Sequence, residues 1–119
     1  MKTGATRKSS PPYIGDIAGM ENALNFGLFT EGRLIAAALG SVRRWWKGTD
    51  YILEELFVAP DMQSGGIGTR FMKMIEDELR KRSIAGIYLQ TDNDKPAYSF
   101  YRKNNYDEMT TRVSFFKKI

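Results

Sequence analysis

The stretch VAPDMQSGGIGTRFM, from Val58 to Met72, decides the fold of this chain. It follows an apolar run that predicts a strand ending at Pro60, because proline cannot continue a strand ladder. Glycines stand at positions 65, 66 and 68, and apolar residues then recur at helical spacing in a charged surround. The pattern predicts a strand, a glycine turn and an amphipathic helix from about Gly66 to Arg82.

The segments around this turn extend the prediction to a mixed sheet. AGIYLQT, Ala85 to Thr91, predicts a strand parallel to the one before the glycines, which completes a βαβ unit. NFGLFTEGRLIAAALGSV predicts a hairpin turning at Glu31 and Gly32, with its second strand from about Arg33 to Val42. RRWWKGTD predicts a loop, and residues 106–111 and 112–119 predict a final strand pair. The expected fold is α/β, with a mixed, mostly antiparallel sheet, a central parallel βαβ unit and flanking helices.

Two short helices are expected outside the βαβ unit. YIGDIAGMENAL predicts one before the hairpin. The other is capped by Asp94, carries Pro96 in its first turn and ends near Asn104, with Asn105 in a left-handed conformation.

Composition limits the classes of function. With 119 residues, 42% hydrophobic and 27% charged, the chain predicts one globular domain over residues 13–119 after a flexible lead over residues 1–12. The absence of cysteine and histidine excludes thiol nucleophiles, Cys/His zinc sites and Ser-His-Asp triads. The net charge of +4 is spread over scattered basic residues without a nucleic-acid motif. We expect a cytoplasmic protein that binds neither nucleic acid nor membrane, because no segment has the length of a signal peptide or a membrane span.

The glycines match neither familiar phosphate loop. The dinucleotide fingerprint fails because its last position is Phe71, and the Walker A pattern fails because Thr69 and Arg70 follow Gly68. Two interpretations stay open: a ligand-free turn, or an anion site on the unpaired N–H groups at the start of the helix.

Two blocks resemble the GNAT N-acetyltransferases. VAPDMQSGGIGT is similar to their motif A, with Gln63, Gly66 and Gly68 at the signature positions. DKPAYSFYRKNNY is similar to a later motif of the family and matches it at four aromatic or small positions: Ala97, Phe100, Tyr101 and Tyr106. The resemblance runs from about Phe26 to the end of the sequence. Only about 24 residues precede that point, whereas family members commonly have a strand and two helices there.

The resemblance implies that acetyl-CoA binds along the strand ending at Val58, with its pyrophosphate on the glycine turn. The residues expected to bind this cofactor are Phe57, Val58, Gln63, Ser64, Gly65, Gly66, Ile67, Gly68, Thr69 and Arg70. No metal is required, because the thioester is already activated.

Acetyl transfer to a primary amine requires a base and an acid. The acidic pair Glu54 and Glu55 precedes the turn, and Glu54 is the expected base because it shares strand parity with the apolar residues that follow. The resemblance assigns Tyr101 as the acid that protonates the departing thiolate, with Tyr98 as the weaker candidate.

The sequence therefore predicts an acetyl-CoA-dependent N-acetyltransferase acting on the amine of a small molecule or peptide. The alternative is a non-catalytic acyl-CoA-binding regulatory module or subunit. A homodimer is expected, with Trp45, Trp46, Phe115 and Phe116 available to line its interface. The two tryptophans flank the expected mouth of the cleft and are left out of the site.

Overall fold

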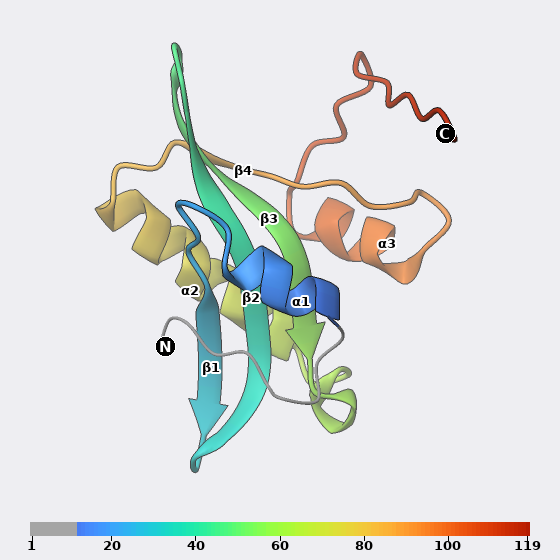
Figure 1. Cartoon of the computed structure of the whole chain (residues 1–119). Helices are drawn as coiled ribbons and strands as arrows, with labels where there is room; N and C mark the ends of the chain where they lie inside the picture. Colours follow the sequence, from blue (N-terminus) through green and yellow to red (C-terminus); the bar gives the residue numbers. More distant parts are fainter. Residues whose placement is uncertain (1–11) are drawn as a thin grey trace.

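The computed structural model describes residues 12–119 and shows one sheet with helices on both faces (Figure 1). The elements are α1 (Pro12–Ala18), β1 (Phe26–Thr30), β2 (Arg33–Trp45), β3 (Gly48–Val58), the 3-10 helix η1 (Pro60–Met62), α2 (Ile67–Lys81), β4 (Gly86–Tyr88) and α3 (Pro96–Lys103). The strand order is β1-β2-β3-β4, with the first two pairs antiparallel and β3–β4 parallel. The predicted mixed sheet with a βαβ unit is confirmed.

The two faces of the sheet bury different layers. Behind the sheet, α2 covers one face, and α1 lies in front of the other (Figure 1). The main core joins α2 to alternate strand residues, and its members include Ala36, Ala38, Tyr51, Leu53, Phe71, Met72, Ile75 and Leu79. The neighbouring residues Ala37 and Leu39 are also buried and alternate with the core set, so they belong to the face that α1 covers.

Gly40 allows Tyr51 to pack at the centre of the sheet. A Cβ atom at this position would lie 2.7 Å from the ring of Tyr51 and would also meet the Ile52 carbonyl oxygen. The Tyr51 ring is fully buried, and its hydroxyl donates to the Leu24 carbonyl at 2.8 Å. Burial raises the pKa of Tyr51 above its ordinary value. The missing side chain at position 40 therefore makes room for the largest residue of the core.

The β1–β2 turn was predicted correctly from the sequence, whereas the β2–β3 turn was not. Glu31 and Gly32 have φ angles of 50° and 77°, which confirms the predicted turn. The predicted loop RRWWKGTD is wrong, because β2 and β3 stay paired as far as Trp45 and Gly48. The strands form a long antiparallel arm whose side chains are mostly exposed, so the alternation that marks a half-buried strand is missing from its sequence.

The C-terminal part departs most from prediction. The strand expected over residues 85–91 is limited to β4, and no strand forms over residues 106–119. Every residue from 107 to 119 is exposed. Alternating apolar residues favour a strand, but a strand also needs a neighbouring edge, and this segment leaves the sheet after α3.

The boundaries of α2 and α3 are close to those predicted, whereas α1 ends at Ala18, before the end of the predicted segment at Leu24. Helix α2 begins after Gly66, and the short first helix is present as α1. The N-cap of α3 is Lys95 rather than the expected Asp94, whereas Asn105 has the predicted left-handed φ of 67°. Helix α1 starts at Pro12, inside the predicted lead, and residues 1–11 lie outside the described part of the chain.

Candidate active site

A cleft opens where β3 and β4 separate. The parallel pairing joins residues 50–52 of β3 to residues 86–88 of β4 and then stops, while β3 continues to Val58. The cleft between the separating segments has a volume of about 660 Å³ and is lined by residues 53–56 and 58 of β3, 89–91 after β4, the glycine turn and α3. Among residues 12–119, the edge of β3 that faces the cleft therefore has no strand partner beyond Ile52.

A β-bulge places the acidic pair on this edge. Leu39 pairs with Glu55 and Gly40 with Leu53, so Glu54 is the extra residue of the bulge. Both glutamates line the cleft; Glu54 is exposed and Glu55 is half-buried. The sequence analysis chose Glu54 because alternating side chains of a strand share a face. That argument fails at this position, because a bulge interrupts strict alternation.

The glycine turn leads directly into the N-terminus of α2. Gly66 is the N-cap with φ 76°, and no side chain caps the helix. The first helical bond runs from Arg70 N–H to the Gly66 carbonyl at 3.1 Å, so the preceding N–H groups of α2 lack helical acceptors. A Cβ at Gly66 would meet no atom within 4 Å, which leaves the space before the helix open. This arrangement suits an anion such as a pyrophosphate.

The other motif residues in the turn have structural roles. A Cβ at Gly68 would lie 3.1 Å from the Phe100 ring, so this glycine lets α2 approach α3 closely. The Gln63 side chain donates to the Val58 carbonyl at 3.1 Å and ties the turn to the end of β3. Of the two glycines, Gly66 opens the ligand space and Gly68 permits the packing that holds it.

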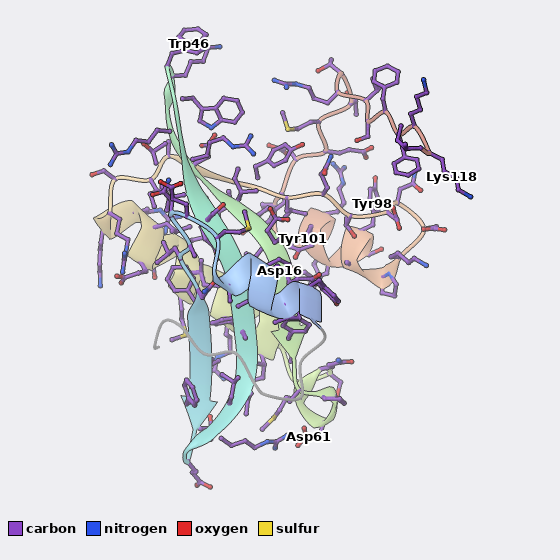
Figure 2. All side chains as sticks on the ribbon, viewed as in Figure 1. Asp16, Trp46, Asp61, Tyr98, Tyr101 and Lys118 are labelled. Atoms are coloured by element: carbon purple, nitrogen blue, oxygen red, sulfur yellow. The ribbon has the colours of Figure 1, made fainter. Side chains whose placement is uncertain are left out.

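Tyr101 lies on α3 at the wall of the cleft (Figure 2). Its ring packs edge-on against Phe100 and Tyr106, with ring centroids 5.2 and 5.4 Å apart. Burial raises the pKa of Tyr101 to about 12, and the negative charge of Glu55 adds to the shift. The Tyr101 hydroxyl is therefore protonated at physiological pH and lies within the electrostatic reach of Glu55.

Tyr98 occupies a different position. Its hydroxyl donates to Glu108 at 2.6 Å, and this hydrogen bond, with the charge of Glu108, raises the Tyr98 pKa. Tyr98 lines a second groove on the outer side of β4 and is not among the residues lining the cleft. Tyr101, in contrast, borders both spaces.

The structure brings together most of the predicted site. The predicted residues that line the cleft are Glu54, Val58, Gln63, Ser64, Gly66, Gly68, Thr69 and Tyr101. Four others, Phe57, Gly65, Ile67 and Arg70, do not line it. Ile67 packs against the core, and Phe57 shares a sheet face with its partner Ala37, opposite the main core. Trp46 lies at the far tip of the β2–β3 arm (Figure 2).

The sequence analysis missed the opposite wall of the cleft. Leu89, Gln90 and Thr91 follow β4 and face the end of β3. The predicted parallel pair could have indicated them, because the carboxyl ends of parallel strands lie at the same edge. Among residues 12–119, no cluster of acidic residues could hold a metal ion, and no helix is long and apolar enough to cross a membrane.

Comparison with known proteins identifies the family. The sequence profile of the Acetyltransferase (GNAT) family matches residues 4–106, and the chain belongs to this family. The [Ribosomal protein bS18]-alanine N-acetyltransferase of Escherichia coli strain K12 is 28% identical over 102 residues, which cover 81% of this chain. The chain spans 63% of the length of that relative.

Solved structures share the fold. An aminoglycoside acetyltransferase, meta-AAC0020 from an uncultured soil metagenomic sample, in complex with sisomicin, superposes with a TM-score of 0.74 at 17% identity, covering 95% of this chain and 78% of that one. The aminoglycoside N-acetyltransferase AAC(6')-Iy in complex with CoA gives a TM-score of 0.70 at 18% identity, covering 88% of this chain and 82% of that one. The GNAT-like architecture predicted from the sequence is confirmed.

Proposed function

We propose that this chain is an N-acetyltransferase that moves an acetyl group from acetyl-CoA to a primary amine. The observation that carries the proposal is the cleft between β3 and β4, which ends at the glycine-opened N-terminus of α2. Family members use acetyl-CoA as the acetyl donor. The start of α2 can accommodate the pyrophosphate of acetyl-CoA, because Gly66 leaves open space before N–H groups that have no helical acceptor.

The chain's own residues hold the donor at two places. The N–H groups at the start of α2 bind the pyrophosphate, with Ser64 and Thr69 beside them. The unpaired edge of β3 offers backbone groups to an extended chain in the manner of an added strand. The bound donor supplies an activated thioester, so Glu54 and Tyr101 have only protons to handle.

Glu54 is the proposed base. A primary amine has a reference pKa of about 10.4 and must lose a proton before it attacks. Glu54 lines the cleft, and its side chain makes no hydrogen bond or ion pair with any residue in the described range, so its carboxylate is free to accept that proton. Glu55, beside it, keeps the region negative and favours a cationic amine at the entrance.

Tyr101 is the proposed acid. The pKa of about 12 keeps its proton in place, but it also makes full proton transfer to a thiolate of reference pKa about 8.5 uphill. The sequence alone suggested an easier transfer. We therefore propose that the Tyr101 hydroxyl donates a hydrogen bond to the departing sulfur and releases its proton only as the bond breaks.

The acceptor belongs to the class of primary amines. The E. coli relative is named for an alanine of a ribosomal protein, and the two structural neighbours are named for aminoglycosides. We further propose that the protein is cytoplasmic and forms a homodimer; the exposed Phe115 and Phe116 support the dimer.

A thiol-release assay tests the function. Purified protein with acetyl-CoA is screened against aminoglycosides, polyamines, amino acids and peptides with an N-terminal alanine, with Glu54→Gln as the matched control of reduced activity. Amine-dependent release of CoA thiol that is much slower with Glu54→Gln supports the proposal. Acetyl-CoA binding by calorimetry without release on any amine would indicate the non-catalytic module instead.

A further inference from the structure

The β2–β3 arm extends past the other strands and the helices (Figure 1). On one side, its last backbone hydrogen bond to another segment runs from Val42 N–H to the Asn22 carbonyl at 3.0 Å. On the other side, Ala85 N–H donates to the Thr49 carbonyl at 2.8 Å. Residues 43–48 form the tip of the arm, and all of them are exposed. No other element of residues 12–119 therefore covers the tip.

The tip combines positive charge with indole rings. Its residues are Arg43, Arg44, Trp45, Trp46, Lys47 and Gly48. Trp45 pairs with Gly48, so Trp46 and Lys47 form the turn. Trp46 is 88% exposed and Trp45 is 45% exposed. No carboxylate of residues 12–119 forms an ion pair with the three cations, so their positive charge is uncompensated.

Two of the cations lie over the indoles. The Arg43 guanidinium carbon is 5.0 Å from the centroid of the Trp45 ring, and the Lys47 Nζ is 4.9 Å from that of the Trp46 ring. Arg43 and Trp45 share a face of β2 because they are two residues apart, whereas Arg44 belongs to the other face. A cation therefore covers one face of each indole, and positive charge is present on both faces of the arm.

This combination is typical of a contact with a membrane surface. Tryptophan is enriched at the boundary between lipid and water, where its ring meets apolar material and its N–H stays hydrated. Arginine and lysine lay their stems along apolar material while their charges stay at the headgroups. From Arg44 to the turn the arm spans roughly 10 Å. Interfacial segments lie at a similar depth, about 5–10 Å into the boundary between headgroups and acyl chains.

We propose that the tip binds the surface of a bilayer that contains anionic lipids. The indoles of Trp45 and Trp46 enter the headgroup layer, and the three cations pair with lipid phosphates. The expectation that the protein binds no membrane rested on the lack of a spanning segment, and a surface contact needs none. The cytoplasmic leaflet carries anionic lipids, which agrees with the proposed location of the protein.

The membrane contact leaves the active-site cleft free. Glu54, which lines the cleft, lies further along β3 from Gly48 at the tip by roughly 20 Å of extended strand. Bilayer binding at the tip therefore does not depend on acetyl transfer, and the two functions can be tested separately.

Single-stranded nucleic acid is the other polyanion that binds aromatic and basic residues together. Proteins that bind it stack successive bases on aromatic rings along a basic groove. Here Arg43 and Lys47 already cover one face of each indole. No residue of the tip lines the active-site cleft or the groove beside β4. A bilayer surface takes up cation and indole together and needs no groove, so it fits the tip better.

Tryptophan fluorescence reports on the tip directly, because Trp45 and Trp46 are the two tryptophans of the chain. The full chain is titrated with vesicles of phosphatidylglycerol and phosphatidylcholine in about equal parts. We expect a blue shift of the emission, and quenching by lipids brominated on the acyl chain near the headgroup. Vesicles of phosphatidylcholine alone should bind about 100-fold more weakly, since each of three cations contributes about fivefold at an anionic surface. An unchanged spectrum at millimolar anionic lipid would overturn the proposal.

Two other occupants of the tip give distinct results. A single-stranded oligonucleotide that quenches the emission, when anionic vesicles leave it unchanged, would assign the tip to nucleic acid. A blue shift that grows with protein concentration in the absence of vesicles would show that a second copy covers the indoles. Either result would overturn the membrane contact.

Charge variants test whether the tip is the site of the attraction. Arg43→Gln combined with Arg44→Gln should weaken co-sedimentation with anionic vesicles about 30-fold, as two contributions of about fivefold require. Lys73→Gln combined with Lys95→Gln is the control, because it removes the same charge from exposed positions in α2 and before α3. Equal weakening by the two pairs would show attraction by net charge alone and would contradict a contact at the tip.

The indole at the turn has a separate test. Trp46→Ala should weaken vesicle binding about tenfold, because the apolar surface of the ring is lost from the interface. Tyr13→Ala is the control, since Tyr13 is an aromatic residue of α1 that is 51% exposed. Co-sedimentation with the same vesicles measures both variants. Wild-type binding by Trp46→Ala would show that the indole does not enter the bilayer and would overturn the proposal.

Discussion

The two halves of β3 differ in what lies beside them. Residues 50–52 have β2 on one side and β4 on the other, and Tyr51, Ile52 and Leu53 are buried. Beyond Leu53 the strand keeps only β2, and its side chains are exposed or half-buried. The first half of the strand builds the core, whereas the second half leaves a backbone edge available to a ligand.

The bulge at Glu54 marks the boundary between the two halves. An extra residue bends a strand and increases its local twist, and here it coincides with the separation of β3 from β4. The same residue interrupts side-chain alternation and brings adjacent glutamates to one cleft. Stability and binding can therefore be changed separately by substitutions on either side of this point.

The largest expected effect on stability lies in the core half. Gly40→Val places a Cβ 2.7 Å from the Tyr51 ring and against the Ile52 carbonyl oxygen, and we expect the free energy of unfolding to fall by about 3 kcal/mol, at the upper end for overpacking. The loss is large against a total stability of roughly 5–15 kcal/mol. Urea unfolding followed by circular dichroism measures it. A variant as stable as the wild type would show that the sheet relaxes around position 40.

In the cleft half, Tyr101→Phe tests the acid. The ring and its packing are kept while the proton is lost, so we expect a rate lower by roughly 10² to 10⁴ and little change in melting temperature. Tyr106→Phe is the matched control, because it removes the hydroxyl that donates to Glu76 at 2.7 Å outside the cleft. An active Tyr101→Phe variant would limit Tyr101 to packing.

Glu54→Gln tests the base. We expect a drop in kcat of about 10², the lower end for general base catalysis, because water also reaches this exposed residue. The defect should be largest at low pH, where unprotonated amine is scarce, and acetyl-CoA affinity should hardly change. Steady-state kinetics across pH would check this. If Glu55→Gln is the more damaging substitution, the base is the neighbouring carboxylate.

Gly66→Val tests the anion site. A valine side chain at φ 76° would occupy the space before α2, and we expect acetyl-CoA to bind about ten times more weakly or worse. Gly32→Val is the control, because Gly32 has φ 77° and equally open surroundings in the β1–β2 turn. Calorimetry on both folded variants isolates ligand contact from backbone strain. Equal affinities would remove Gly66 from the binding site.

The smallest effect concerns the charge beside Tyr101. Glu55→Gln removes the negative neighbour and should lower the pKa of Tyr101 from about 12, while the larger effect of burial remains. NMR of ζ-carbon-labelled tyrosine would follow the titration. Because the folded state holds this proton more tightly than the unfolded state, stability should decline as pH rises from about 10 through 12. The decline should begin at the same pH and be smaller in Glu55→Gln.

Local patterns in the sequence were sufficient for the elements near the glycine turn. The spacing of four apolar residues predicted α2: Phe71, Met74, Ile75 and Leu79. All of them except the exposed Met74 are buried in the core. Glycine at position 32 predicted the first hairpin turn, and the βαβ order predicted the parallel pair. These features depend on residues close together in the chain, or on a handedness rule that holds for most folds.

The sequence by itself determined the family, the mixed sheet and the position of the glycine turn. Only the tertiary structure decided that the bulge falls at Glu54, that Gly68 fits against Phe100 and that burial raises the pKa of Tyr101 to about 12. The structure also showed that the segment after residue 106 forms no strand within its own sheet. The physical reason is the same in each case. Register, close packing, burial and strand pairing all depend on a neighbour that is distant in the chain, and local pattern carries no information about that neighbour's position.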